Sequence, residues 1–340
     1  MATRVIAVTN QKGGVGKTTT TANVAYALSK KGYDVLAIDF DSQASLTNYL
    51  NVGLGEDEEY YGVYEMMVSQ LREFDPGEAP ELEGLDFSGI CEKCICRPTY
   101  TTREMQSIDG VKKVVDVPKE FGFDLLPSHL NLSDYELEIS NLRDQERASN
   151  GYRLYNVIQD IIEWHPYDYI LIDCNPSLGV MAMNAITAAT DGVLIPTNLD
   201  LMSTRGCVNL INKIADVQEV LLRATDNAVK HMGVIGVVLN LYAERRTVDK
   251  TIQNDLTRFY PFKIFDTCIP ESVNAKKAVF AGVLYSMMYK KAETAYLSLA
   301  DEIVAKMDEM SERGQVIQRL DFSDNSDIGE SYEGDEDNEL

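Results

Sequence analysis

Short runs of β-branched and apolar residues recur along the chain, and stretches with apolar residues at helical spacing separate them. The runs include Arg4–Thr9, Ile170–Asp173 and Val234–Leu239, and the helical stretches include Tyr152–Trp164 and Ala292–Met310. Apolar runs without alternation are typical of strands that are buried on both faces. The order of these segments therefore predicts an α/β fold, a mostly parallel twisted sheet with helices on both faces.

A glycine-rich loop joins the first predicted strand to the first predicted helix, which we expect over Thr18–Lys31. Its sequence is Lys12-Gly13-Gly14-Val15-Gly16-Lys17-Thr18-Thr19. Glycines let the backbone turn its N–H groups toward phosphate oxygens, and the start of a helix favours an anion. In such a loop Lys17 would neutralise the β- and γ-phosphates, and the hydroxyl of Thr18 would bind Mg²⁺. The loop therefore predicts a nucleotide and Mg²⁺ as cofactors.

The lysine at the second position of this loop, Lys12, makes the chain resemble the ParA/MinD ATPases, whose phosphate loop deviates from the general pattern. Further motifs are similar to the ParA side of that group, and together the resemblance covers about residues 1–70 and 122–312. They are Asp39-Phe40-Asp41-Ser42-Gln43, with Ser42 where the family has proline; Tyr167 to Gly179, with Asn175 in place of a second proline; and Val193–Thr197, Val234–Asn240 and Ile269-Pro270.

The resemblance implies an ATPase that uses ATP and Mg²⁺, and it assigns roles to single residues. Asp41 would orient the attacking water. Thr18 and Asp173 would hold Mg²⁺, and Asp39 would support the metal shell. Transfer of a phosphoryl group needs this combination of a placed water, a metal ion and positive charge.

The resemblance also assigns the contacts to the nucleotide. Lys17 would serve the nucleotide of its own subunit, whereas Lys12 would reach the nucleotide of a second subunit, so that ATP joins a homodimer. The other nucleotide contacts that the family implies are Gly13, Gly14, Val15, Gly16, Thr18, Thr19, Asn240 and Pro270.

ParA-like proteins bind DNA nonspecifically as ATP-bound dimers, and a centromere-binding adaptor of the ParB type triggers hydrolysis and release. The resemblance therefore implies a role in plasmid or chromosome partitioning, in the cytoplasm and on the nucleoid. Arg246 is similar to the family's arginine position for DNA contact, with Arg245 beside it, and Lys276 and Lys277 are further basic candidates. The segment Glu271–Asn274 stands where the family often has Arg-Asn-Val-Arg, so the basic surface is thinner than usual or has moved.

Charge is distributed unevenly along the 340 residues, which carry −23 in total. Residues 321–340 contain nine acids and no base, and residues 56–86 contain eleven acids and one arginine, which leaves −4 for the remainder. A nearly neutral body permits a local basic face that binds DNA.

Composition and the extent of the resemblance also predict the domain boundaries. We expect an ATPase domain over residues 1–77 and 122–312, an inserted segment over residues 78–121, and a disordered acidic tail over residues 313–340. The tail is either a solubilising segment or a competitor that covers the protein's own basic surface.

The inserted segment contains Cys91, Cys94 and Cys96. Three close thiolates could bind zinc or an iron–sulfur cluster, with Cys174, Cys207 or Cys268 as a distant fourth ligand. Free or redox-active thiols are the alternative, because the spacing matches no standard metal signature.

Two other functions remain open at this stage. One is a spatial-positioning or regulatory ATPase with little DNA binding, which the acidic segments favour. The other is a relative of the iron–sulfur reductases that share the phosphate loop. No apolar run approaches the roughly 18 residues of a membrane span, and the N-terminus enters a strand without a secretory leader. A membrane-binding terminal helix is disfavoured by the acidic tail that follows it.

Overall fold

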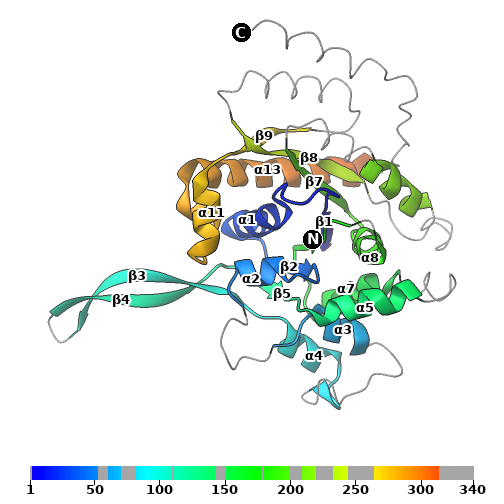
Figure 1. Ribbon diagram of the computed structural model, residues 1–340, viewed down its shortest axis with the longest axis horizontal. Helices are drawn as coiled ribbons and strands as arrows, with labels where there is room; N and C mark the ends of the chain where they lie inside the picture. The colour runs from blue at the N-terminus through cyan, green and yellow to red at the C-terminus, as the bar shows by residue number, and fades with distance from the viewer. Residues whose placement is uncertain are drawn as a thin grey trace, which may run out of the picture.

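The computed structural model describes residues 2–52, 60–69, 82–108, 111–141, 151–177, 179–198, 209–219, 233–243 and 264–313. Its centre is a seven-stranded sheet in which every neighbouring pair of strands is parallel, in the order β5-β2-β6-β1-β7-β8-β9 (Figure 1). This confirms the predicted α/β fold. The strands are β1 (Arg4–Val8), β2 (Val35–Phe40), β5 (Asp124–Leu126), β6 (Tyr169–Cys174), β7 (Gly192–Asn198), β8 (Val234–Tyr242) and β9 (Ile264–Pro270).

Both faces of the sheet are covered. Successive residues of its central strands point to opposite faces, and each face packs in its own apolar core. In β1, Val5 and Ala7 belong to one core, whereas Ile6 and Val8 belong to the other. Burial of each large apolar side chain contributes about 1.5–3 kcal/mol to stability. The uninterrupted apolar runs in the sequence are therefore the signature of a two-faced sheet.

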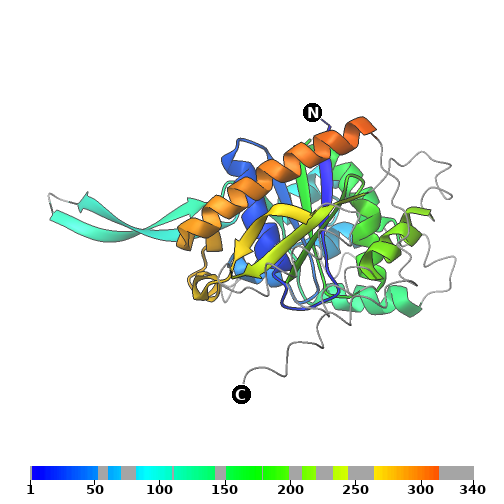
Figure 2. The same cartoon turned by 90° about the horizontal axis from the view of Figure 1, so that it is seen from above.

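The helices divide between the two faces accordingly (Figures 1 and 2). One face is covered by α1 (Lys17–Lys30), α2 (Ser45–Tyr49), α11 (Val273–Phe280), α12 (Tyr285–Met288) and α13 (Lys290–Arg313). The other face is covered by α3 (Val63–Ser69), α4 (Phe87–Cys94), α5 (Asn131–Asn141), α7 (Arg153–Trp164), α8 (Val180–Ala188) and the helical residues 209–219.

A long β-hairpin stands away from this body at the left of Figures 1 and 2. It consists of β3 (Thr99–Ile108) and β4 (Val111–Glu120), which form a separate two-stranded antiparallel sheet among the described strands. Its base is held by an ion pair of 2.8 Å between Arg97 and Asp124 and by the Tyr100 ring, whose centroid lies 4.9 Å from that of Phe121. Within residues 78–121, α4 thus packs in the core, while the hairpin projects.

Parallel strands place all their carboxyl ends at one edge of the sheet, which is where such folds bind ligands. The loops after β1, β2, β6, β8 and β9 leave the sheet at this edge. None of the helices that the structure describes is both long enough and apolar enough to cross a membrane. The predicted DNA contacts Arg245 and Arg246, and residues 314–340 of the predicted tail, lie outside the described residues.

Candidate nucleotide site

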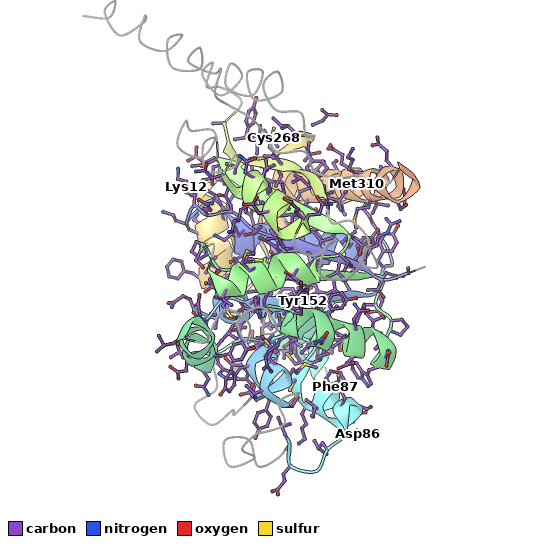
Figure 3. The ribbon with its side chains drawn as sticks, turned by 90° about the vertical axis from the view of Figure 1, so that its right-hand side faces the viewer. Lys12, Asp86, Phe87, Tyr152, Cys268 and Met310 are labelled. Carbon is purple, nitrogen blue, oxygen red and sulfur yellow. The ribbon has the colours of Figure 1, made fainter. Side chains whose placement is uncertain are left out.

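The predicted phosphate loop connects β1 to α1, and Figure 3 shows Lys12 at the left-hand rim, on the opposite side from Met310 near the end of α13. The loop is braced from within by Asn10, whose Oδ1 accepts a hydrogen bond from the Lys12 N–H at 3.0 Å. The other end of that amide donates to the Pro196 carbonyl at 2.8 Å. The loop is therefore fixed to the end of β7 before any ligand binds.

The glycines of the loop have different physical roles. Gly13 and Gly14 are exposed, and a Cβ atom on either would meet no atom within 4 Å. This open space beside backbone N–H groups suits a phosphate. Gly14 and Gly16 have φ values of +76° and +86°, a left-handed conformation that disfavours side chains.

Asn240, at the end of β8, lies directly behind the loop. Its Nδ2 donates to the Val15 carbonyl at 2.7 Å and to the Thr20 hydroxyl at 3.0 Å. A Cβ atom on Gly16 would come within 2.7 Å of the same nitrogen. The Oδ1 of Asn240 is buried and finds no hydrogen-bond partner within the part of the chain that is described. The sequence prediction placed Asn240 at the nucleotide, and the structure adds a bracing role.

Two buried carboxylates stand side by side beneath the loop, because Asp39 on β2 and Asp173 on β6 are partners in the strand register. Asp173 accepts hydrogen bonds from the hydroxyls of Thr18 at 2.7 Å and Thr21 at 3.1 Å. Burial raises the pKa of Asp173 to about 8, and the charge of Asp39 adds to this rise. Burial likewise raises the pKa of Asp39 to about 6.

A divalent cation would relieve this crowding of negative charge. The oxygens of Thr18 and Asp173 are hard donors of the kind that Mg²⁺ prefers, so the residues present fit the predicted metal. Lys17 is the nearby cation: its Nζ lies 3.4 Å from the Lys12 carbonyl oxygen, and burial lowers its pKa while the charge of Asp173 opposes that shift. The fit rests on Thr18 and Asp173 more than on Asp39.

Asp39 is already engaged with the protein. Its Oδ2 accepts hydrogen bonds from the N–H of Thr47 at 2.8 Å and from the Thr47 hydroxyl at 2.7 Å, and its Oδ1 accepts from the Asp41 N–H at 3.3 Å. Asp39 therefore holds the loop that carries Asp41. Its role in the metal shell stays a prediction.

Asp41 is buried, and hydrogen bonds hold both its side chain and its backbone. Its Oδ1 accepts from the Gln43 N–H at 3.0 Å, and its carbonyl accepts from the Ser128 hydroxyl at 2.9 Å. The Ser128 N–H in turn donates to the Thr47 hydroxyl at 2.9 Å. Sequence reasoning missed Thr47 and Ser128, because these contacts join the loops after β2 and β5, more than 80 residues apart.

Glu136 on α5 is a further residue that no motif marked. Burial and the nearby charge of Asp41 both raise its pKa. Its Oε1 would lie 3.2 Å from a Cβ atom placed on Gly179, in the segment after β6 that resembles the family's switch. A half-buried carboxylate therefore faces the place where the attacking water is predicted.

The remaining predicted contacts lie at the same edge of the sheet. Pro270 ends β9, and its carbonyl accepts a hydrogen bond from the Tyr285 hydroxyl at 2.8 Å. Lys276 and Lys277 are exposed on α11, which begins three residues later. Pro270 and the two lysines thus lie at the ligand-binding edge of the sheet, while their contacts with nucleotide or DNA stay predictions.

The cysteines of the inserted segment do not converge. Cys91 and Cys94 lie in the core on one face of the sheet, whereas Cys96 packs against the core on the other. Figure 3 shows Cys268 and Phe87, the first residue of α4, at opposite ends of the molecule. No cluster of three or more histidine, cysteine or acidic side chains is arranged for a metal among the described residues, and Cys207 lies outside them.

Comparison with known proteins confirms the resemblance to the ParA/MinD ATPases. A family model described as an AAA domain matches residues 3–226. The chromosome partitioning protein ParA of Caulobacter vibrioides is 29% identical over 306 residues, 89% of this chain and 94% of that protein. The sporulation initiation inhibitor Soj of Bacillus subtilis is also 29% identical, over 89% of this chain and 98% of its own.

A solved structure with the same fold is Cyanothece McdA without nucleotide, at a TM-score of 0.62 and 19% identity. That match covers 89% of this chain and 99% of McdA. Another is the septum site-determining protein MinD of Pyrococcus horikoshii with Mg-ADP, at a TM-score of 0.53 and 21% identity, over 88% of this chain and 96% of MinD.

Proposed function

The chain belongs to the AAA-domain family of P-loop ATPases, and on that premise we propose that it is a ParA-like ATPase that dimerises on ATP. The ATP-bound dimer binds DNA nonspecifically and releases it when a ParB-type adaptor stimulates hydrolysis. Plasmid or chromosome partitioning is the process served, as similarity to the Caulobacter chromosome partitioning protein and to a plasmid partition protein of Borrelia burgdorferi suggests. The observation that carries this proposal is the loop that brings Lys12 beside Lys17.

In the proposed reaction, the backbone N–H groups of Gly13–Gly16 and the ammonium of Lys17 hold the phosphates. Thr18 and Asp173 would hold Mg²⁺, which when bound supplies positive charge to the transferring phosphoryl group. Asp41 orients the attacking water, and Ser128 and Thr47 keep its loop in place. Because Asp41 is buried, little bulk solvent competes for that position.

Lys12 has a different task from Lys17. Its backbone is fixed by Asn10, and the residue lies at the rim of the nucleotide edge (Figure 3), where a second copy can approach. We assign its ammonium to the nucleotide of that second copy, so hydrolysis depends on dimerisation. The buried Oδ1 of Asn240 supports an additional hydrogen bond to an N–H donor of the nucleotide.

The proposed DNA surface includes Lys276 and Lys277 on α11, together with Arg245 and Arg246. Phosphate contacts are individually replaceable and depend strongly on salt. The two lysines are exposed at the same edge as the nucleotide site, so dimerisation would bring two such pairs together. A spatial-positioning ATPase with little DNA binding is the second candidate, and the net charge of −23 favours it.

The decisive experiment compares the wild-type protein with Asp41→Ala, using Asp301→Ala on the surface of α13 as the control. Light scattering with Mg²⁺ and ATP should show a lasting dimer for Asp41→Ala and a transient one for the control. Duplex DNA is then titrated with ATP, ADP or no nucleotide across a salt series. DNA binding only in the ATP state supports partitioning; dimerisation without DNA binding supports the positioning candidate. A chain that stays monomeric with a slowly hydrolysed ATP analogue refutes both.

A further inference from the structure

The projecting hairpin has no role in the nucleotide site. Among the strands that the structure describes, none joins this two-stranded ribbon, and such a ribbon gains little stability of its own in water. One face, which carries Met105 at 68% and Val114 at 63%, is exposed along its described length, whereas side chains such as Val115 and Val117 on the other face are half-buried. Packing against the body therefore does not account for the projecting part of the hairpin, which indicates a binding role.

Charge is arranged differently along the two halves of the hairpin. Near the body, cations are paired with acids: Arg103 with Asp116 at 3.4 Å, and Lys119 with Glu104. Toward the tip, Lys112 and Lys113 are exposed and form no ion pair with any residue that the structure describes. In the sequence from Ser107 to Lys113, Asp109 is the one acid beside these two lysines, which gives this stretch a net charge of +1.

The two lysines point to opposite faces of the ribbon. Lys112 is paired with Ser107 and Lys113 with Gln106, and successive residues of a strand face opposite ways. The tip therefore presents one ammonium on each side, beside a hydroxyl or an amide from the other strand. This arrangement suits a ligand that flanks the ribbon on both sides.

Distance from the acidic body is the second feature of the tip. With a rise of about 3.3 Å per residue, the eight steps from Lys112 to Glu120 span about 26 Å. Charges in solution are screened over about 8–10 Å at physiological salt. The negative charge of the body is thus largely screened at the tip, which can approach an anion that the body would repel.

We propose that the hairpin is a DNA-binding arm whose tip enters a groove of duplex DNA, with Lys112 and Lys113 contacting phosphates of the two strands. The major groove is about 12 Å wide and admits a two-stranded β-ribbon. Phosphates of one DNA strand line each side of the major groove, so lysines on opposite faces of the ribbon can each contact a different strand. The contacts are to the backbone and do not depend on base sequence. This inference rests on the proposed DNA binding and adds a surface distinct from Lys276 and Lys277.

The test uses the full chain with three variants. The first is Lys112→Gln with Lys113→Gln, and the second replaces the same lysines with arginine, which keeps the charge. The third, Lys30→Gln with Lys31→Gln, makes the same charge change at the end of α1. Affinity for a short duplex is measured with a slowly hydrolysed ATP analogue across a salt series. Unstimulated ATPase activity and thermal stability are measured for each variant to confirm that folding is intact.

We expect the arm variant with glutamine to bind DNA on the order of tenfold more weakly at 0.1 M salt. The slope of log affinity against log salt should fall by about 1.8 for each arm engaged, because each phosphate contact contributes about 0.9. The arginine variant and the Lys30/Lys31 variant should bind as the wild type does.

Three other results would contradict the proposed DNA-binding arm, and each has a different meaning. Equal DNA binding by the arm variant and the wild type refutes the arm while the proposed function stands. Absence of DNA binding by the wild type in every nucleotide state refutes the proposed function and the arm together. Loss of stimulation by an adaptor protein with unchanged DNA binding shows that the arm, with Met105 and Val114, binds protein instead.

Discussion

The side chain of Asn240 holds the phosphate loop from behind, because its Nδ2 lies 2.7 Å from the carbonyl oxygen of Val15. The two residues are 225 positions apart in the sequence. The contact leaves no room for a side chain on Gly16, so the loop keeps its shape through packing as well as through glycine's backbone freedom.

Alanine substitution at two glycines of the loop should therefore have different effects on stability. Gly16→Ala places a Cβ atom 2.7 Å from Asn240 in a left-handed conformation and should cost about 1–3 kcal/mol of unfolding free energy. Gly13→Ala enters open space and should change stability by less than about 0.5 kcal/mol, serving as the control. Urea unfolding without nucleotide measures both. Equal losses would show that Asn240 does not restrict the loop.

The two lysines of the loop should separate nucleotide binding from hydrolysis. Lys17→Ala should weaken ATP binding by about 30- to 160-fold, since a charge-assisted contact contributes about 2–3 kcal/mol. Lys12→Ala should still bind ATP but should neither dimerise nor hydrolyse it at the normal rate. Calorimetry gives the affinities, and light scattering gives the oligomeric state. Normal turnover by Lys12→Ala would contradict the assignment of its ammonium to a second subunit.

Ser128 should act on turnover through the loop of Asp41. Ser128→Ala removes the hydrogen bond to the Asp41 carbonyl and should lower kcat about tenfold, for a loss of about 1–1.5 kcal/mol, with little change in KM. Ser133→Ala is the control, because that hydroxyl makes a local bond to Leu130 on the surface. A rise in KM with unchanged kcat would mean that Ser128 serves binding, not the placement of Asp41.

The thiols of α4 should be inert in the folded protein. Burial raises the pKa of Cys91 to about 12 and raises that of Cys94 further still. A raised pKa keeps each thiol protonated, so alkylation by iodoacetamide should stay slow between pH 7 and 9.5, whereas an exposed thiol reacts faster as its thiolate forms. Mass spectrometry with and without denaturant measures this. Rapid modification of the native protein would point to the redox-active alternative.

The phosphate loop and the sheet could be predicted because their signals are local. Lys12 to Thr19 form a continuous motif, and the apolar run of β6 identifies a buried strand without knowledge of its neighbours. Glu136, Thr47 and Ser128 could not be found in this way. They come near Asp41 only after α2, α5 and the loop after β5 meet at one edge of the sheet, and no spacing in the sequence encodes that meeting.

The hairpin is an intermediate case. Asp109-Gly110 between two β-branched stretches is a strong hairpin signal. The prediction of an inserted segment over residues 78–121 uses the extent of the resemblance and the three cysteines, and not this hairpin signal. That α4 packs in the core while β3 and β4 project depends on tertiary contacts, among them the pair between Arg97 and Asp124.

The central position of β1 has a consequence for synthesis. Its two neighbours are β6 and β7, so this apolar segment leaves the ribosome first and waits for partners more than 160 residues later. At about 5–20 residues per second, the nascent chain exposes it for roughly 10–40 seconds. Asn240 emerges later still, which means that a growing polypeptide cannot hold ATP tightly before most of the protein has been translated.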